Sequence, residues 1–398
     1  LNNSPMIIYA YEARQVKIVK LLAEKGADLD VENSSKESLL HLAVMKNDSA
    51  TVQFLLDKGA SPDRKGSQGR TPLFMAVEKG NGKIAELFIK KGADSNTFNN
   101  SGKNIMHILA SSKNRGKMIA AFSGYGININ KTDSTGRTPL MTAVSGKRWE
   151  NVKPLIDAGA SFRFTDMAGK SLLVMAMEIK NTSLALYLIE KGIDIKQKDR
   201  SGRTALHTAA SYRGKAWDNL LALLIQKGRN INEGDNSGVT AAGVAIDSGN
   251  SSGFKIMLDN GLDINLKEKG TDPLVLYAYK KNQKAIFTEL SKRGADITLK
   301  DGNGDSILHL VAEKGDMGFY KTLAASNPDL NITNKEGKTP LFLAIEKGKA
   351  SFAKTLLEQK DKTNLKLKDS RGMSVLHYLA MLKRGVPLLS MFEVNPQW

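Results

Sequence analysis

Apolar residues along the chain fall into two short patterns that alternate and recur about every 33 residues. The first pattern has Leu or Met two residues after a Ser, Thr, Asn or Asp, and alanine five or six residues after the same polar residue. The second is an amphipathic run that closes on glycine, as in IAELFIKKGAD at 84–94. One apolar face per run is typical of a surface helix that packs on a neighbour. The pattern therefore predicts a chain built from helix pairs.

The polar residue at the head of the first pattern is the expected helix N-cap. Its side-chain oxygen can accept a hydrogen bond from the free N–H groups of the first helical turn. Proline follows it at positions 5, 72, 139, 273 and 340, where the missing N–H costs nothing. The expected caps, 32 to 36 residues apart, are Ser4, Ser38, Thr71, Asn104, Thr138, Ser171, Thr204, Thr240, Asp272, Ser306, Thr339 and Ser374. This period predicts twelve repeats, numbered here in chain order.

A tight turn is expected between successive helix pairs. Gly92 has the position of the left-handed residue that ends a helix. Segments such as DSTG (133–136) and DRSG (199–202) then place a second glycine where a turn requires positive φ. In the second repeat Lys36 replaces this turn glycine. Because one helix pair cannot bury its own apolar faces, the repeats are expected to stack.

The repeated motif resembles the ankyrin-repeat family, as seen in DRSGRTALHTAA (199–210) and KGADLD (25–30). The resemblance covers essentially the whole chain. It implies an all-α fold, a curved, right-stacked solenoid of helix-turn-helix units with β-turn fingers, as a single domain over 1–398. Residues 1–33 are the expected N-terminal cap repeat, 34–368 the internal repeats and 369–398 the C-terminal cap repeat. Either the native chain continues beyond this last repeat or Trp398 seals it.

No group of residues predicts catalysis. All five histidines lie three residues after a cap, where the resemblance implies a hydrogen bond from the helix start to the adjacent finger. They are at least 66 residues apart, so they cannot share a metal ion. DGNGD (301–305) lacks the later glycine and glutamate of a calcium loop and is expected to be a finger turn. We therefore expect a protein that is not an enzyme and has no cofactor.

The repeats also show a longer rhythm. Repeats 1 to 3 match repeats 9 to 11 at an offset of 268 residues, which indicates the duplication of a block. Two similar surfaces are then expected, suited either to a partner that repeats a motif or to two copies of one partner, unless both surfaces have since diverged. Repeat 7 has three extra residues near RGKAWDN (213–219). Repeat 8 has Ala242 at the usual leucine position and glycines at 243, 249 and 253. This repeat is expected to be the weakest in the interior.

Composition adds limits on compartment and partner. The chain has no cysteine, which favours an exported or oxidising compartment, with the cytoplasm as the alternative. No apolar run approaches the roughly 20 residues that a bilayer requires. The first residues already belong to the repeat pattern, so any targeting segment is expected to have been removed or never to have been present. The net charge of +17 divides into +6, +5 and +6 over 1–133, 134–267 and 268–398. Such a charge favours acidic partners.

Two sets of side chains are candidates for partner binding. A basic residue directly before the cap forms a ladder along the fingers: Arg70, Lys103, Arg137, Lys170, Arg203 and Lys338. The resemblance places contact residues on the first helices, which adds Tyr11, Tyr212 and Tyr279. We expect a scaffold that binds an acidic protein through its concave face and fingers. The alternative is a polyanion binder, for nucleic acid, anionic glycan or lipid headgroups, although the ladder has no aromatic residues between its members. Self-association into a homo-oligomer stays open.

Overall fold

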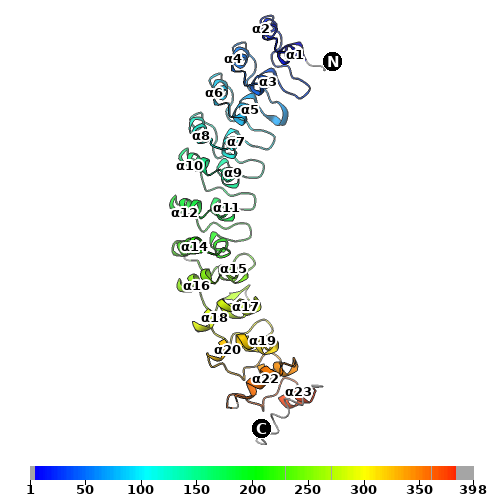
Figure 1. The fold of residues 1–398 in the computed structure, drawn as a ribbon, viewed down its shortest axis with the longest axis vertical. Coiled ribbons are helices and arrows are strands. Elements are labelled where there is room, and N and C mark those ends of the chain that lie inside the picture. The colour runs from blue at the N-terminus through cyan, green and yellow to red at the C-terminus, as the bar shows by residue number, and fades with distance from the viewer. Residues whose placement is uncertain (1–4, 229, 270, 360, 382–398) are drawn as a thin grey trace. The chain divides into compact units, whose positions relative to one another are not determined.

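The computed structural model describes residues 5–228, 230–269, 271–359 and 361–381 and divides the chain into two compact units, 1–194 and 195–398. In both units the chain forms antiparallel helix pairs, and a long loop leads from each pair to the next (Figure 1). These loops are the fingers. The expected Ser4 cap, the second half of the last repeat and Trp398 lie outside the described residues.

In the first unit the first helices of the pairs lie in one layer and the second helices in another (Figure 1). Neighbouring first helices pack on one another, as α7 does on α9. The first helices are α1 (Met6–Glu12), α3 (Leu39–Met45), α5 (Pro72–Lys79), α7 (Ile105–Ser111), α9 (Pro139–Ser145) and α11 (Leu172–Glu178). The second helices are α2 (Val16–Glu24), α4 (Ser49–Asp57), α6 (Gly82–Lys90), α8 (Gly116–Ser123), α10 (Trp149–Asp157) and α12 (Thr182–Glu190). A short 3-10 turn, η1 (Ser67–Gly69), forms the third finger.

The second unit has the same construction. Its first helices are α13 (Ala205–Ala210), α15 (Ala241–Ser248), α17 (Leu274–Lys280), α19 (Ile307–Lys314), α21 (Pro340–Glu346) and α23 (Val375–Met381). Its second helices are α14 (Lys215–Gly228), α16 (Ser251–Asp259), α18 (Lys284–Lys292), α20 (Met317–Ala324) and α22 (Ala350–Leu357). The extra residues of repeat 7 belong to the loop and to α14, which at 14 residues is longer than the other second helices. One finger contains an antiparallel pair of two-residue strands, β1 (Lys267–Glu268) and β2 (Asp272–Pro273).

The expected cap residue is the N-cap of the first helix in repeats 2 to 8, 10 and 11. The hydroxyl of Thr71 accepts from the N–H of Phe74 at 3.2 Å, and Asn104, Thr138, Ser171 and Thr240 accept at the same position. Repeats 1 and 9 differ from the prediction, because α1 begins after Pro5 and α17 after Pro273, one residue later than expected. The carboxylate of Asp272 instead binds the ammonium of Lys280 at 3.0 Å.

The turn residues have the predicted backbone. Gly92 has a φ of 85°, and the finger glycines Gly136 and Gly202 have φ of 75° and 80°. Lys36 occupies the same left-handed region with a φ of 61°. A non-glycine residue is uncommon in this region. The finger therefore keeps its shape in the second repeat without its glycine.

The glycines of repeat 8 have local roles that the sequence did not reveal. A Cβ at Gly243 would overlap the carboxylate of Glu268, which is fully buried and accepts from the N–H and the hydroxyl of Thr240 at 3.1 and 2.7 Å. Gly249 ends α15 in the left-handed conformation, with a φ of 63°. A Cβ at Gly253 would overlap the buried Asn250 side chain. Two of the three glycines thus make room for a buried polar side chain.

Candidate interaction surface

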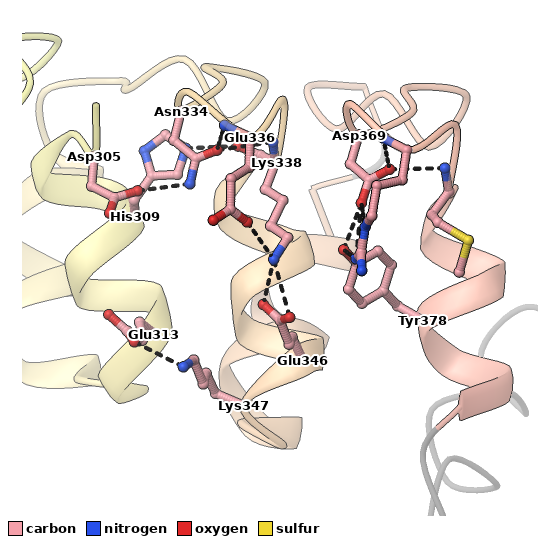
Figure 2. Close-up of polar contacts among 12 residues, drawn as sticks. Asp305, His309, Glu313, Asn334, Glu336, Lys338, Glu346, Lys347, Asp369 and Tyr378 are labelled. Carbon is pink, nitrogen blue, oxygen red and sulfur yellow. Dashed lines mark hydrogen bonds and ion pairs between the residues drawn. The ribbon is translucent and has the colours of Figure 1, made fainter. Parts of the chain in front are cut away.

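Three members of the basic ladder pair with a glutamate eight residues later, at the end of the same first helix. Arg70 lies 3.0 Å from Glu78, and Lys170 lies 2.5 Å from Glu178. Figure 2 shows the third case, in which the ammonium of Lys338 lies between Glu336 and Glu346, at 2.7 and 3.0 Å. At these positions the protein itself supplies the carboxylate that the cation binds.

Lys338 is not the exposed cation that the sequence predicted. Its residue is only 7% exposed, since its stem lies in the finger and its ammonium is held by the two glutamates. Burial alone would lower the pKa of Lys338, but the bonds to Glu336 and Glu346 outweigh it and raise the pKa above its usual value. Lys338 therefore forms structural ion pairs with Glu336 and Glu346 of its own repeat.

Arg203 has a partner of a different kind. Its guanidinium lies 3.0 Å from Asp235 in the next finger, and Ser211 stands eight residues later, where other repeats have glutamate. Asp235 accepts further hydrogen bonds from the backbone N–H groups of Ser237 and Val239. Arg203 thus joins two neighbouring fingers.

The remaining two members, Lys103 and Arg137, have no carboxylate within ion-pair distance among the described residues. They stand in consecutive repeats, the fourth and fifth. The residue eight positions later is Ser111 in one and Ser145 in the other. Repeats 3 to 6 therefore carry four successive basic positions, of which the outer two are paired internally and the inner two are open.

Positive charge is concentrated in these same two repeats. Residues 99–165 contain ten Lys and Arg but only three Asp and Glu, a net +7, whereas residues 1–98 have a net +2. Every residue of 99–165 is described, and none of its ten cations forms an ion pair within the described chain. Division into thirds conceals this concentration, because the boundary at 133 and 134 falls between repeats 4 and 5.

Buried histidines hold the backbone of the ladder in place. The Nε2–H of His107 donates to the carbonyl of Arg137 at 2.9 Å, and His41 and His309 donate in the same way to the carbonyls of Arg70 and Lys338. The other ring nitrogen, Nδ1, accepts from the cap residue, as that of His41 does from the N–H of Ser38 at 3.2 Å. The hydrogen bond expected between helix start and adjacent finger is therefore confirmed at these histidines.

Two of the three candidate tyrosines lie in the core instead of on the surface. Tyr11 and Tyr279 are each 3% exposed. Their hydroxyls donate to the carboxylate of Asp48 and to the carbonyl of Leu310, and burial raises the pKa of both. Their position near the end of the first helix turns the ring against the next repeat. Tyr212 is half-buried and stacks on Trp217 at 4.2 Å between ring centroids.

Exposed aromatic residues occur on the fingers, where the sequence predicted only basic contact residues. Phe98 is 46% exposed, and the ammonium groups of Lys65 and Lys131 lie 5.0 and 5.3 Å from its ring centroid. These lysines come from the fingers before and after it. Phe164 and Met167 are exposed two fingers further on. Aromatic and basic side chains thus do alternate on the fingers, although not within the ladder itself.

The described residues contain no cluster of His, Cys, Asp and Glu able to hold a metal ion. None of their helices has both the length and the apolar character needed to cross a bilayer. DGNGD at 301–305 is a finger turn, since Asp301 accepts from the N–H groups of Asn303 and Asp305.

Comparison with protein families agrees with this construction. A family model described as ankyrin repeats (3 copies) matches residues 6–99, 150–235, 172–268, 215–301, 274–369 and 308–392. The chain belongs to the ankyrin-repeat family. The predicted all-α ankyrin fold is thereby confirmed. Residues 100–149 of this ankyrin-repeat protein fall between two matches, and there the structure has the same helix pairs.

A comparison with curated proteins gave no match to the chain. What the family establishes is general: ankyrin repeats are protein–protein interaction modules and are typically not catalytic. For this ankyrin-repeat protein the question becomes which part of its surface takes a partner, and of what charge.

Proposed function

We propose that this ankyrin-repeat protein is a non-enzymatic scaffold that binds an acidic protein partner on the fingers and basic ladder positions of repeats 4 and 5. The observation that supports this proposal most is the net +7 of residues 99–165, whose cations have no ion-pair partner within the described chain. Elsewhere the ladder is neutralised by the chain's own carboxylates. A cluster of open cations attracts acidic surfaces and speeds their encounter.

The exposed side chains of the fingers fit a protein partner. Phe98 and Phe164 offer apolar contact area beside the cations. Such a combination is typical of protein interfaces, in which aromatic residues and arginine supply most of the binding energy.

Binding of nucleic acid is the second candidate. The contact of Phe98 with Lys65 and Lys131 favours it, because stacking platforms place aromatic rings among cations. Against it, the chain has only 6% aromatic residues, and Phe98 lies alone between its two lysines.

The test compares the wild-type chain with a variant in which Lys131, Arg137 and Arg163 are changed to glutamate. Each chain is used to capture proteins and nucleic acids from its source cells, with quantitative mass spectrometry and nuclease treatment. Acidic proteins should be captured by the wild type and lost from the variant. A control changes the exposed Lys255, Lys321 and Lys366 to glutamate, which alters the net charge equally but leaves repeats 4 and 5 intact.

Two results would refute the proposed function. One is equal loss of the captured proteins in both variants, which would mean that net charge alone matters. The other is capture that disappears on nuclease treatment, which would favour nucleic acid.

A further inference from the structure

The paired ladder positions reveal what the open ones are shaped to bind. In repeats 3 and 6 the cation before the cap receives a carboxylate from a residue eight positions later. In repeats 4 and 5, which have the same helix-pair construction, that residue is serine. Serine has no carboxylate, and the Ser111 hydroxyl donates to the carbonyl of Ile108 in its own helix at 3.0 Å. The place of a carboxylate is therefore left open twice in succession.

The surroundings of Ser111 strengthen this comparison. The Nε of Arg148 donates to the carbonyl of Ser111 at 2.9 Å, which brings a second guanidinium to the end of α7. Ser111 and Ser145 are the last residues of their helices, and neither is buried. A carboxylate arriving from outside would therefore meet Lys103 and Arg148 at one position and Arg137 at the next.

We infer that Lys103 and Arg137 form a tandem receptor for two carboxylates of the partner, which take the places that Glu78 and Glu178 fill in the flanking repeats. This inference rests on the proposed function and specifies its recognition element. Packed helices lie about 8–10 Å apart, and a polyproline II segment, in which every third side chain lies on the same face, rises about 3.1 Å per residue. The two carboxylates of an extended acidic segment are therefore about three residues apart.

The experiment introduces the missing carboxylates as side chains of the protein itself. In the full chain Ser111 and Ser145 are both changed to glutamate, and the matched control changes both to glutamine. The probe is a synthetic 12-residue peptide of Gly and Ser with glutamate at every third position, and its affinity is measured by fluorescence anisotropy. The glutamate variant should bind the probe about tenfold more weakly, because its own carboxylates occupy the cations. The glutamine variant should bind as the wild type does.

A double variant reverses the change. Glu78→Ser and Glu178→Ser together remove the internal carboxylates of the outer positions and should tighten binding of the same peptide about threefold or more. Thermal unfolding provides the check on folding. Both glutamates are exposed, so the melting temperature should change little in this variant and should be kept or raised in the Ser→Glu variant.

The outcomes separate this inference from the proposed function. Equal binding of the probe by the Ser→Glu and Ser→Gln variants would overturn the inference. So would a peptide with four adjacent glutamates binding as well as the spaced one, or inorganic polyphosphate binding where the peptide does not. If acidic partners are lost on changing Lys131, Arg137 and Arg163 but are kept by the Ser→Glu variant, the proposed function stands and the carboxylate receptor does not. If the probe responds as expected while no acidic partner is captured, the two positions bind carboxylates but the proposed function fails.

Discussion

The cap histidines His41, His207 and His309 use both ring nitrogens, which fixes the nitrogen that carries the hydrogen. In His309, Nδ1 accepts from the N–H of Ser306 at 3.2 Å, so Nε2 carries the hydrogen that it donates to the carbonyl of Lys338 at 2.9 Å. Protonation would place a hydrogen on the accepting nitrogen. Burial lowers the pKa of His309, and also that of His107 and His207, below the usual value.

Acid should therefore destabilise the protein before its carboxylates titrate. The folded chain binds protons at these histidines more weakly than the unfolded chain, so their stabilising effect is complete above about pH 6.5 and is lost as the pH falls below it. In urea unfolding, the midpoint concentration of urea should fall as the pH is lowered from 8 to 5. A His309→Gln variant should be about 1–2 kcal/mol less stable at pH 8, with a smaller deficit at pH 5. A pH-independent deficit would contradict this account.

Glu268 has the role in repeat 8 that histidine has in other repeats, but from the opposite side. It reaches from the next finger to the cap Thr240, and Gly243 leaves the space for it. Burial raises the pKa of this carboxyl group. The sequence showed a glycine in a buried helical position but offered no way to predict which side chain would fill the space. That arrangement depends on a contact between residues 25 positions apart.

Changing Gly243 to Ala should destabilise the protein by about 1–3 kcal/mol, because the new methyl group and the Glu268 carboxylate cannot both fit. Denaturant unfolding of Gly243→Ala, Glu268→Ala and the double variant measures the coupling between the two positions. The cost of Gly243→Ala should be smaller when Glu268 is already Ala. Additive costs would show that the glycine serves another purpose.

At the level of elements, the sequence predicts the helix pairs well because the apolar pattern and the cap chemistry agree in each repeat. Thr71 and Thr138 begin their helices where expected, with proline in the first turn. The prediction was wrong at Asp272, because α17 begins one residue later, after Pro273, and the Asp272 carboxylate binds Lys280. An ion pair between residues eight positions apart is a contact that the apolar pattern and the cap chemistry do not contain.

Helices α15 and α16 should open more easily than other interior pairs. Gly243 and Gly253 lie inside these helices, and a glycine in a helix costs about 0.5–1 kcal/mol relative to alanine. Helix α15 buries Ala242 at the position where the other first helices have Leu or Met. Gly249 does not contribute, because its left-handed conformation suits glycine.

Hydrogen exchange under native conditions measures this difference, since the stability of a repeat array is nearly a sum over repeats and their interfaces. Amide protection should be lower in α15 and α16 than in α5, α6, α9 and α10. Equal protection in the two sets would mean that the buried Glu268 and Asn250 compensate fully for the glycines.

At the level of the whole molecule, the location of charge is the part of the candidate surface that the sequence contains. The net charge is nearly even over thirds of the chain, but residues 99–165 alone carry +7. The pairing of Arg70, Lys170 and Lys338 could not be counted in this way, because it requires knowing that a residue and the one eight positions later meet along the first helix. The burial of Tyr11 and Tyr279 likewise depends on the neighbouring repeat.

The two compact units should differ in their affinity for acidic ligands. Residues 1–194 contain both open ladder positions, and residues 195–398 contain Arg203 and Lys338, which are paired. Expressed separately, the first unit should retain most of the affinity of the full chain for the glutamate peptide, and the second should bind at least about tenfold more weakly. Circular dichroism of each half checks that it folds. Similar binding by both halves would instead favour the two equivalent surfaces that the 268-residue duplication suggested.

The pairing along the ladder has a consequence for how such a protein changes over generations. The residue that opens or closes a ladder position is exposed and makes no contribution to the core, as with Glu78 and Glu178. A single replacement there alters what one repeat offers to a ligand while the stacking of repeats is untouched. A lineage could therefore move or lengthen its recognition surface one repeat at a time. Selection for a new partner and selection for a stable fold would then act on different residue positions of the same repeat.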